Sequence, residues 1–169
     1  MTAPTDFSTC DLCDAHKAGY ANGDGAFRVL PPVFRDFGAR TRAYGQPGAA
    51  RGGAENPPGE GALGERRVGR VLVVDGGGSL RRALIGGNIA AAAAKNGWAG
   101  VLIDGAARDK AELAAADVGI RALALCPMPT ERKTPGHTGV PVLIQGVWVR
   151  PGDWLYADED GIVVMPSQA

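Results

Sequence analysis

Two continuous apolar runs flank an alanine-rich segment in the middle of the chain. The runs RVLVVDG, starting at residue 70, and GVLIDG, starting at residue 100, have the length of buried strands. Between them, IAAAAAKNG favours a short helix, with Asn88 as a candidate N-cap and Gly97 just past the helix end. A strand, a helix and a strand in this order predict a βαβ unit whose strands are parallel and covered on both faces.

The pattern continues on both sides of this unit. KAELAAADVG predicts a further short helix, and IRALALCPM a third strand. The C-terminal tail alternates strand-like segments with turns at Gly146, Pro151-Gly152 and Asp160-Gly161. The first fifty residues contain a helical segment, TCDLCDAHKAG, followed by short apolar pieces. The sequence therefore predicts an α/β domain that ends in an antiparallel β tail.

Residues 45–69 interrupt the pattern. The segment GQPGAARGGAENPPGEGALGERRVG is dense in glycine and proline and has almost no hydrophobic periodicity. Such a composition buries too little apolar surface to offset the entropy of ordering the chain. We predict a long Gly/Pro-rich loop here, within a single domain that spans residues 1–169.

Composition and charge narrow the classes of partner. The chain has 169 residues, of which 45% are hydrophobic, so it is long enough for one compact domain with a proper core. Eighteen basic residues balance eighteen acidic ones, which gives little electrostatic reason to expect nucleic acid or an anionic membrane as partner. Neither a charged leader with an apolar run nor a stretch of about 18 apolar residues is evident, so we expect a soluble, cytoplasmic protein. Three cysteines, an odd number, do not suggest a disulfide framework.

Candidate ligand-binding residues follow the predicted parallel strands, whose C-terminal ends usually carry the ligands of an open α/β sheet. Gly86 and Gly87 immediately precede the alanine-rich helix, so a ligand can approach the backbone closely. The free N–H groups of the first helical turn, around Asn88 and Ile89, would suit a carboxylate or phosphate. The alternative is that these glycines only form tight turns.

Arg108 and Asp109 leave the second strand at the same edge of the sheet. A guanidinium is suited to holding a carboxylate and a developing enolate oxygen, and a nearby carboxylate can hold Mg²⁺. The competing interpretation is a local ion pair in which Asp109 is the N-cap of the next helix. Glu112, three residues further on, would then complete a capping-box-like arrangement.

Two other motifs favour structural roles. Cys10, Cys13 and His16 are spaced by three on the predicted first helix, but a structural zinc site usually needs four ligands. A packed helix with partly buried thiols is the better interpretation. The segment YADEDG lacks the length and terminal glutamate of an EF-hand loop, so it predicts a β-turn between the last two strands.

These motifs, taken together, resemble those of the RraA-like family. The resemblance is carried by GRVLVVDGGGSLRRALIGGNIAAAAAKNGWAGVLIDGAARD, DVGIRALALCPMP and VRPGDWLYADEDGIVV, and more weakly by DLCDA and PPVFRDFGAR. The family includes the regulators of ribonuclease E activity and the class II 4-hydroxy-4-methyl-2-oxoglutarate aldolases. The resemblance implies a "swivelling" β/β/α domain with a central mixed sheet and a ring-shaped homotrimer with active sites at subunit boundaries, and it leaves open whether trimers pair into hexamers.

The aldolases of this family cleave 4-hydroxy-4-methyl-2-oxoglutarate to two pyruvates and decarboxylate oxaloacetate, using Mg²⁺ or Mn²⁺. By this resemblance Arg108 holds pyruvate and its enolate, Asp109 binds the metal, and the backbone of Gly86, Gly87, Asn88 and Ile89 takes the substrate carboxylate. The alternative within the family is a non-catalytic protein that binds and inhibits ribonuclease E. Members of that kind typically lose the aspartate of the Arg-Asp pair, which this chain retains.

The chain departs from the aldolase motif at one position. That motif places an acidic residue, then twenty intervening positions, then Arg-Asp, and here the acidic position is Gly87. The family's aspartate at this point assists proton transfer. Its absence implies weaker aldol cleavage than oxaloacetate decarboxylation, which needs less acid–base help.

Overall fold

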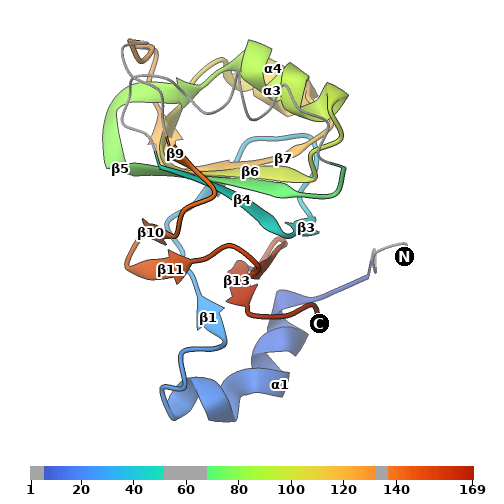
Figure 1. Cartoon of the computed structure of the whole chain (residues 1–169). Helices are drawn as coiled ribbons and strands as arrows, with labels where there is room; N and C mark the ends of the chain where they lie inside the picture. The colour runs from blue at the N-terminus through green and yellow to red at the C-terminus, as the bar shows by residue number, and fades with distance from the viewer. Residues whose placement is uncertain (1–5, 52–67, 132–136) are drawn as a thin grey trace.

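The computed structural model describes residues 6–51, 68–131 and 137–169, which form a mixed α/β domain (Figure 1). A seven-stranded sheet lies at its centre, with strand order β2-β7-β6-β5-β4-β9 and β8 paired to β6. The contacts of β4 with β5, β5 with β6 and β6 with β7 are parallel, and β2 and β9 are antiparallel at the two edges. Its strands are β2 (Arg35–Asp36), β4 (Pro47–Arg51), β5 (Val71–Ile85), β6 (Gly100–Ala107), β7 (Gly119–Ala122), β8 (Ala124–Leu125) and β9 (His137–Thr138).

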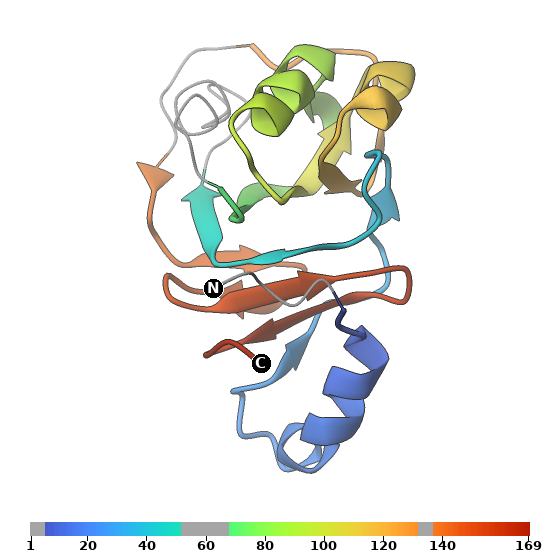
Figure 2. The ribbon, with the colours of Figure 1, turned by 90° about the vertical axis from the view of Figure 1, so that its right-hand side faces the viewer.

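The other elements cover the two faces of this sheet. The short helices α3 and α4 lie on one face, and the antiparallel strands of the tail lie on the other, with α1 beyond them (Figure 2). The tail contributes the hairpin β10–β11 and the strands β12 and β13, which join β1 and β3 from the N-terminal part in a four-stranded sheet of order β1-β13-β12-β3. The bounds are α1 (Thr9–Ala21), β1 (Arg28–Val29), β3 (Ala43–Gly45), α3 (Gly87–Lys95), α4 (Lys110–Ala115), β10 (Val142–Ile144), β11 (Val147–Val149), β12 (Trp154–Ala157) and β13 (Ile162–Met165).

The continuous apolar runs are explained by burial on both faces. Successive residues of a strand point to opposite sides, so Leu72 and Val74 of β5 pack in the core beneath α3 and α4. Val71 and Val73 pack in a second core against the tail strands. All eight residues of β6 are buried. The predicted βαβ unit is therefore confirmed as β5–α3–β6.

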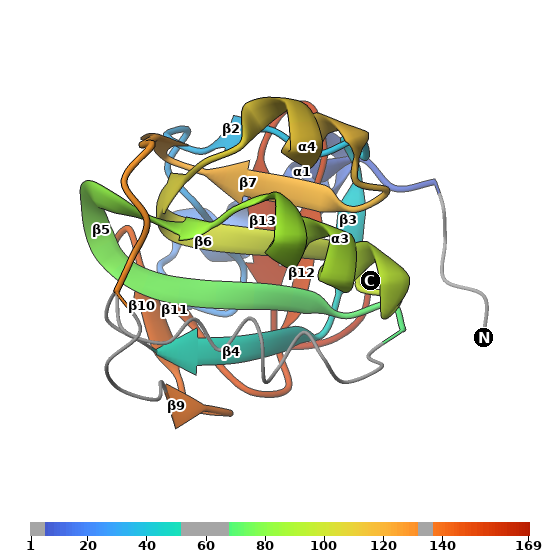
Figure 3. The same cartoon turned by 90° about the horizontal axis from the view of Figure 1, so that it is seen from above.

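The strand β5 is longer than its sequence indicates. The glycines after Asp75 suggest an end, yet the strand continues to Ile85 with register shifts against β6, and it curves across the sheet (Figure 3). Gly77 and Gly78 have φ of 66° and 70°, a conformation that other L-residues rarely adopt, so they permit the bend. The extension brings Ile85 and the start of α3 alongside the end of β6.

The predicted loop over residues 45–69 is wrong at its beginning. Pro47–Arg51 forms β4, which pairs in parallel with β5 and joins the central sheet. Its hydrophobic pattern is weak because a small residue is needed there: a Cβ on Gly48 would lie 3.1 Å from the Trp98 ring. Backbone hydrogen bonding to β5 defines this strand. Residues 52–67 of the predicted loop lie outside the described residues.

Helix ends and turns follow the sequence with one exception. Helix α3 begins at Gly87 with Gly86 as N-cap, so the predicted N-cap at Asn88 is wrong by two residues. Gly97 has φ of 78° after the helix, as a C′ glycine should. The tail turns are confirmed around Gly146, Pro151-Gly152 and residues 158–161. In the part of the chain described, no helix is both long and apolar enough to cross a membrane.

Candidate functional site

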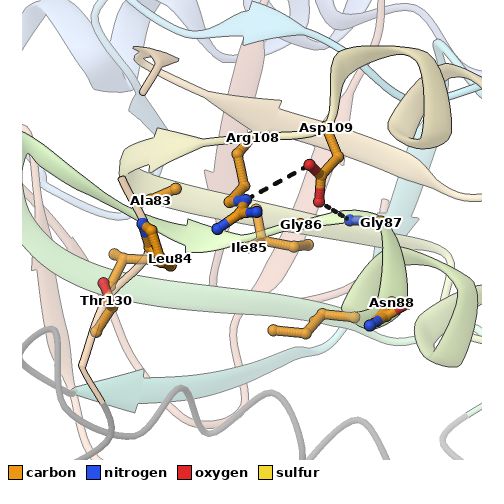
Figure 4. Close-up of a pocket in the computed structure, with 11 residues that line it drawn as sticks. Ala83, Leu84, Ile85, Gly86, Gly87, Asn88, Arg108, Asp109 and Thr130 are labelled. Atoms are coloured by element: carbon orange, nitrogen blue, oxygen red, sulfur yellow. Dashed lines mark hydrogen bonds and ion pairs between the residues drawn. The ribbon is translucent and has the colours of Figure 1, made fainter. Parts of the chain in front are cut away.

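An open cleft of about 240 Å³ lies where β5 and β6 end and the two short helices begin (Figure 4). It contains all of the residues that the sequence singled out as a site. They come from four segments: the end of β5, the first turn of α3, the junction of β6 with α4, and a stretch after β8. The lining residues are Ala83, Leu84, Ile85, Gly86, Gly87, Asn88, Ile89, Arg108, Asp109, Pro129 and Thr130.

The Arg108–Asp109 junction is held by contacts to both neighbouring elements. The Arg108 backbone N–H donates to the Ile85 carbonyl at 2.9 Å, which fixes the end of β6 against the end of β5. Asp109 has a left-handed backbone, with φ of 62°. Its Oδ2 accepts a hydrogen bond of 3.0 Å from the N–H of Gly87, the first residue of α3. Its Oδ1 lies 3.4 Å from Nε of Arg108.

This geometry separates the two interpretations of Asp109. Asp109 does stand at the N-cap position of α4 and beside Arg108, as the structural interpretation predicts. Its side chain, however, makes no capping hydrogen bond to α4, so the capping-box prediction with Glu112 is wrong. The left-handed backbone turns the carboxylate toward the N-terminus of α3 instead. The carboxylate therefore lies in the cleft, as Figure 4 shows.

The surroundings of Asp109 favour its ionised form. The Gly87 N–H lowers the pKa of this carboxyl group most strongly. Desolvation raises the pKa by a smaller amount, and the charge and hydrogen bond of the nearby Arg108 guanidinium lower it further. The partial positive charge at a helix N-terminus acts in the same direction. About a third of each side chain is exposed, with 36% for Arg108 and 33% for Asp109, so both remain accessible to a ligand.

Gly86 and Gly87, the N-cap and first residue of α3, leave room for two carboxylates. A Cβ on Gly86 would lie 2.6 Å from Oδ2 of Asp109, so that position must be small if Asp109 is to reach the helix. At Gly87 the space that a side chain would fill is taken by Glu112, whose Cδ lies 2.6 Å from an ideal Cβ there. Both carboxylates therefore lie against the same short stretch of backbone.

Sequence reasoning assigned Glu112 only a capping role. Glu112 does not line the cleft itself; it lies in the first turn of α4, and its carboxylate reaches the backbone at Gly87, beside the cleft. Gly87, where the aldolase motif has an acid, is the position against which Glu112 packs. The carboxylate absent at residue 87 is thus replaced in space by one from α4.

Pro129 and Thr130 also line the cleft without a sequence signal. The Ala83 N–H donates to the Met128 carbonyl at 2.7 Å, and the Thr130 N–H donates to the Ala83 carbonyl at 3.1 Å. These bonds hold the segment after β8 against β5, although more than forty residues separate them. In the view of Figure 4 the Arg108 guanidinium lies between Asp109 and Thr130.

The remaining sequence candidates lie away from the cleft and have structural contacts. Cys10 and Cys13 are free thiols on α1, exposed and half-buried respectively, and the His16 ring stacks on Phe27 with centroids 4.9 Å apart. Burial raises the pKa of the Cys13 thiol. The YADEDG segment forms the predicted turn between β12 and β13, and its Asp158 binds the start of α1.

The carboxylate of Asp109 fits a hard divalent cation. Mg²⁺ typically uses one or two protein carboxylates and fills its other positions with water and substrate. The described residues contain no group of three or more potential ligands, so they offer no all-protein cage of the kind that a structural zinc ion uses. Mg²⁺ or Mn²⁺ matches the oxygen donors of this cleft.

Known proteins share the sequence pattern and the fold of this chain. The RraA-like family model, described as Aldolase/RraA, matches residues 9–164. A relative from Albidiferax ferrireducens, provisionally named 4-hydroxy-4-methyl-2-oxoglutarate aldolase, is 58% identical over 166 residues, covering 94% of each chain. The solved structure of the RNA-processing inhibitor RraA from Thermus thermophilis has a TM-score of 0.89 at 40% identity, covering 98% of this chain and 96% of that one.

A second solved structure carries a different functional name. It is the S-adenosylmethionine:2-dimethylmenaquinone methyltransferase from Geobacillus kaustophilus, with a TM-score of 0.87 at 34% identity and 96% of each chain covered. The names of these relatives thus disagree about activity, whereas their folds and the family model agree. The chain belongs to the RraA-like family.

Proposed function

We propose that this protein is a divalent-metal-dependent lyase that cleaves a carbon–carbon bond in small 2-oxo acids. Its substrates would be 4-hydroxy-4-methyl-2-oxoglutarate, cleaved to two pyruvates, and oxaloacetate, decarboxylated to pyruvate. The observation that carries the proposal is the pairing of Arg108 with Asp109 at the N-terminus of α3 inside a cleft. Relatives with aldolase names support it.

The cleft offers two groups for the substrate carboxylate. The backbone N–H groups in the first turn of α3, from Gly87 to Ile89, have no earlier helical carbonyl to bind and point toward an anion placed there. Arg108 adds a planar fork of donors that matches a carboxylate. Together they would orient the 2-oxo acid with its reacting carbon in the cleft.

Asp109 would hold Mg²⁺ or Mn²⁺ near the first turn of α3, with water and substrate filling the other coordination positions. When bound, such a cation supplies Lewis-acid polarisation of the substrate's 2-oxo group. Arg108 contributes the second positive charge, since its guanidinium can follow the negative charge as it develops on the enolate oxygen. An interaction that strengthens as this charge develops lowers the barrier for the chemical step.

The same bond breaks in both substrates, and the two reactions differ only in one additional proton transfer. The bond beyond C3 breaks, its electron pair forms the pyruvate enolate, and protonation at C3 then gives pyruvate. Aldol cleavage also requires that the 4-hydroxyl group lose its proton, whereas decarboxylation releases carbon dioxide without this step. Glu112 would accept that proton, since it lies against Gly87, where the aldolase motif has an acid.

A second candidate function has its own support. The structure of an RNA-processing inhibitor RraA has 40% sequence identity to this chain, so a protein that binds and inhibits a ribonuclease is the alternative. A net charge of zero suits a protein surface better than RNA as its contact. This alternative predicts no turnover and no loss of function when Arg108 or Asp109 is replaced. A cytoplasmic homotrimer is part of either proposal.

The deciding experiment measures pyruvate release from both substrates with a lactate dehydrogenase couple, in Mg²⁺, in Mn²⁺ and in EDTA. We expect turnover with either metal, none in EDTA, and a loss of about a thousandfold in Asp109→Ala with the fold retained. Asp117→Ala is the matched control, because Asp117 is an exposed aspartate that pairs with Arg40 outside the cleft. Full metal-dependent activity in a folded Asp109→Ala protein would refute the assignment, and absence of turnover in the wild type would favour the ribonuclease inhibitor.

A further inference from the structure

The carboxylate of Asp109 occupies the place that the proposed function gives to the substrate. Its Oδ2 accepts the N–H of Gly87 at 3.0 Å, and its Oδ1 faces Nε of Arg108 at 3.4 Å. These are the helix N-terminus and the guanidinium that would hold a substrate carboxylate. The protein therefore presents its own anion to its anion-binding groups.

This internal contact depends on several features of the chain. Asp109 adopts a left-handed backbone that costs free energy for a residue with a side chain, and aspartate is among the few residues that tolerate it. Gly86 must lack a Cβ, because an added one would lie 2.6 Å from Oδ2. The side chain is one-third exposed, so it can leave this position without disturbing a core.

We propose that Asp109 acts as a competitive latch, which holds the first amide of α3 and Arg108 until a divalent cation draws its carboxylate away and opens both to the substrate carboxylate. The inference rests on the proposed function, because it concerns the order in which that site fills. A divalent cation would bind the Asp109 carboxylate more strongly than its present partners do. These partners are the Gly87 N–H at 3.0 Å and Nε of Arg108 at 3.4 Å. Metal and 2-oxo acid then bind with positive coupling, with the metal first.

A simple positioning role for the same contact predicts something different. If the Gly87 N–H only orients Asp109 toward a cation, the bond persists when the metal binds, and the substrate uses the remaining amides of α3. Metal and substrate would then show no competition that involves Asp109. The two possibilities differ in how removing the carboxylate changes metal-free binding of an anion.

The test measures pyruvate affinity by isothermal titration calorimetry, in EDTA and in saturating Mg²⁺, for the wild type and for Asp109→Gly. Glycine adopts the left-handed backbone readily, so the fold is retained while the charge and the acceptor of the Gly87 N–H are both lost. In EDTA we expect pyruvate to bind Asp109→Gly about tenfold more tightly than the wild type, within the usual range of such couplings. Mg²⁺ should strengthen pyruvate binding to the wild type by a similar factor and leave the variant unchanged.

Glu112→Gln is the matched control for charge. It removes one negative charge from the same helical turn but leaves the Asp109–Gly87 hydrogen bond in place. If Glu112→Gln raises metal-free affinity as much as Asp109→Gly does, electrostatics alone explain the gain and the latch is overturned. Equal metal-free affinities of the wild type and Asp109→Gly would overturn it as well.

A spectroscopic readout follows the hydrogen bond directly. In ¹H–¹⁵N spectra, addition of Mg²⁺ alone should move the Gly87 amide resonance, while the Thr9 amide, bonded to Asp158, should stay in place. A Gly87 resonance unmoved at saturating Mg²⁺ contradicts the latch. Neither assay needs turnover, so coupled binding without pyruvate release would refute the lyase and support the latch. A wild type that binds no pyruvate under either condition overturns both.

Discussion

Two aspartates, one in the turn between β12 and β13 and one after the end of β6, make the same bond with opposite consequences. Asp158 accepts the N–H of Thr9, the first residue of α1, at 2.7 Å, and Asp109 accepts the N–H of Gly87, the first residue of α3, at 3.0 Å. In both cases a carboxylate from a distant turn meets the positive end of a helix. Local chemistry alone does not distinguish the two.

The two carboxylates differ in exposure and in how many hydrogen bonds they accept. Asp158 is 2% exposed and also accepts the Thr9 hydroxyl at 2.6 Å and the backbone N–H groups of Asp160 and Gly161. Asp109 is one-third exposed, faces an open cleft, and has Arg108 as its other neighbour. A saturated, buried carboxylate anchors a helix, whereas an accessible one beside a cation remains available to a ligand. Accessibility and unused hydrogen-bonding capacity, more than the helix N-terminus itself, mark the functional end.

The largest effect on stability is expected at Asp158. Asp158→Ala leaves the buried N–H and hydroxyl group of Thr9 without their acceptor, which should lower the free energy of unfolding by about 3 kcal/mol. Urea denaturation followed by circular dichroism measures this change. Activity per folded molecule should be unchanged, because Asp158 lies outside the cleft.

The neighbouring Glu159 provides the control for this prediction. Its exposed side chain lies 3.4 Å from Arg42, so Glu159→Ala should change the free energy of unfolding by about 0.5 kcal/mol or less. If the two variants are equally stable, Asp158 is no anchor and the contrast with Asp109 fails.

A smaller effect, on activity alone, is expected at Glu112. Glu112→Gln should lower kcat/KM for aldol cleavage about tenfold, less than a directly acting base usually contributes, because water can partly replace it. Oxaloacetate decarboxylation should fall less, since it has no hydroxyl proton to remove. Gly87→Ala should produce the same imbalance, because its Cβ displaces the Glu112 side chain.

Asp117→Asn is the control on the same side of the domain, and it should leave the ratio of the two activities unchanged. Equal losses of both activities in Glu112→Gln would show that Glu112 has no particular role in proton transfer. The thermal unfolding midpoint of each variant separates these effects from a loss of folded protein.

The contrast also shows what the sequence could predict. Apolar runs such as residues 71–74 and 101–103 predicted the βαβ unit because burial on both faces leaves a direct signal. The strand β4 has no such hydrophobic signal in the sequence, because Gly48 must be small beside Trp98. Backbone hydrogen bonds to β5 define the place of β4 in the sheet. Hydrophobic patterning reports what a side chain buries, and it does not report which backbone it pairs with.

The site was predictable to the same extent. The end of a buried parallel strand placed Arg108 and Asp109 at a ligand-binding edge, and the family resemblance added the Gly86–Ile89 stretch. The hydrogen bond from Gly87 to Asp109 was not predictable, because it depends on the left-handed backbone at Asp109. Thr130 was missed because backbone bonds to Ala83 bring it to the cleft from a distant part of the chain.

The smallest predicted effect is the pH dependence of the Asp158 anchor. Burial raises the pKa of this carboxyl group, but the hydrogen bonds from Thr9, Asp160 and Gly161 outweigh it and leave the pKa below its ordinary value of 3.8. A pKa lowered by folding contributes stability that is present above the unfolded value and is lost as the pH falls through the folded value. We therefore expect the stability difference between wild type and Asp158→Asn to be constant above about pH 5 and to narrow below about pH 4.

Urea titrations at a series of pH values measure this difference, and comparison with the variant removes the contributions of other carboxylates. Asp109→Asn serves as the counterpart, because the pKa of Asp109 is also lowered but its carboxylate is accessible. Water competes for an exposed hydrogen bond and so weakens its contribution to stability. The free energy of unfolding of Asp109→Asn should therefore differ little from that of the wild type at every pH. If the stability difference from the wild type narrows at low pH as much for Asp109→Asn as for Asp158→Asn, both carboxylates are structural. Ligand binding alone would then distinguish the helix anchor from the ligand site.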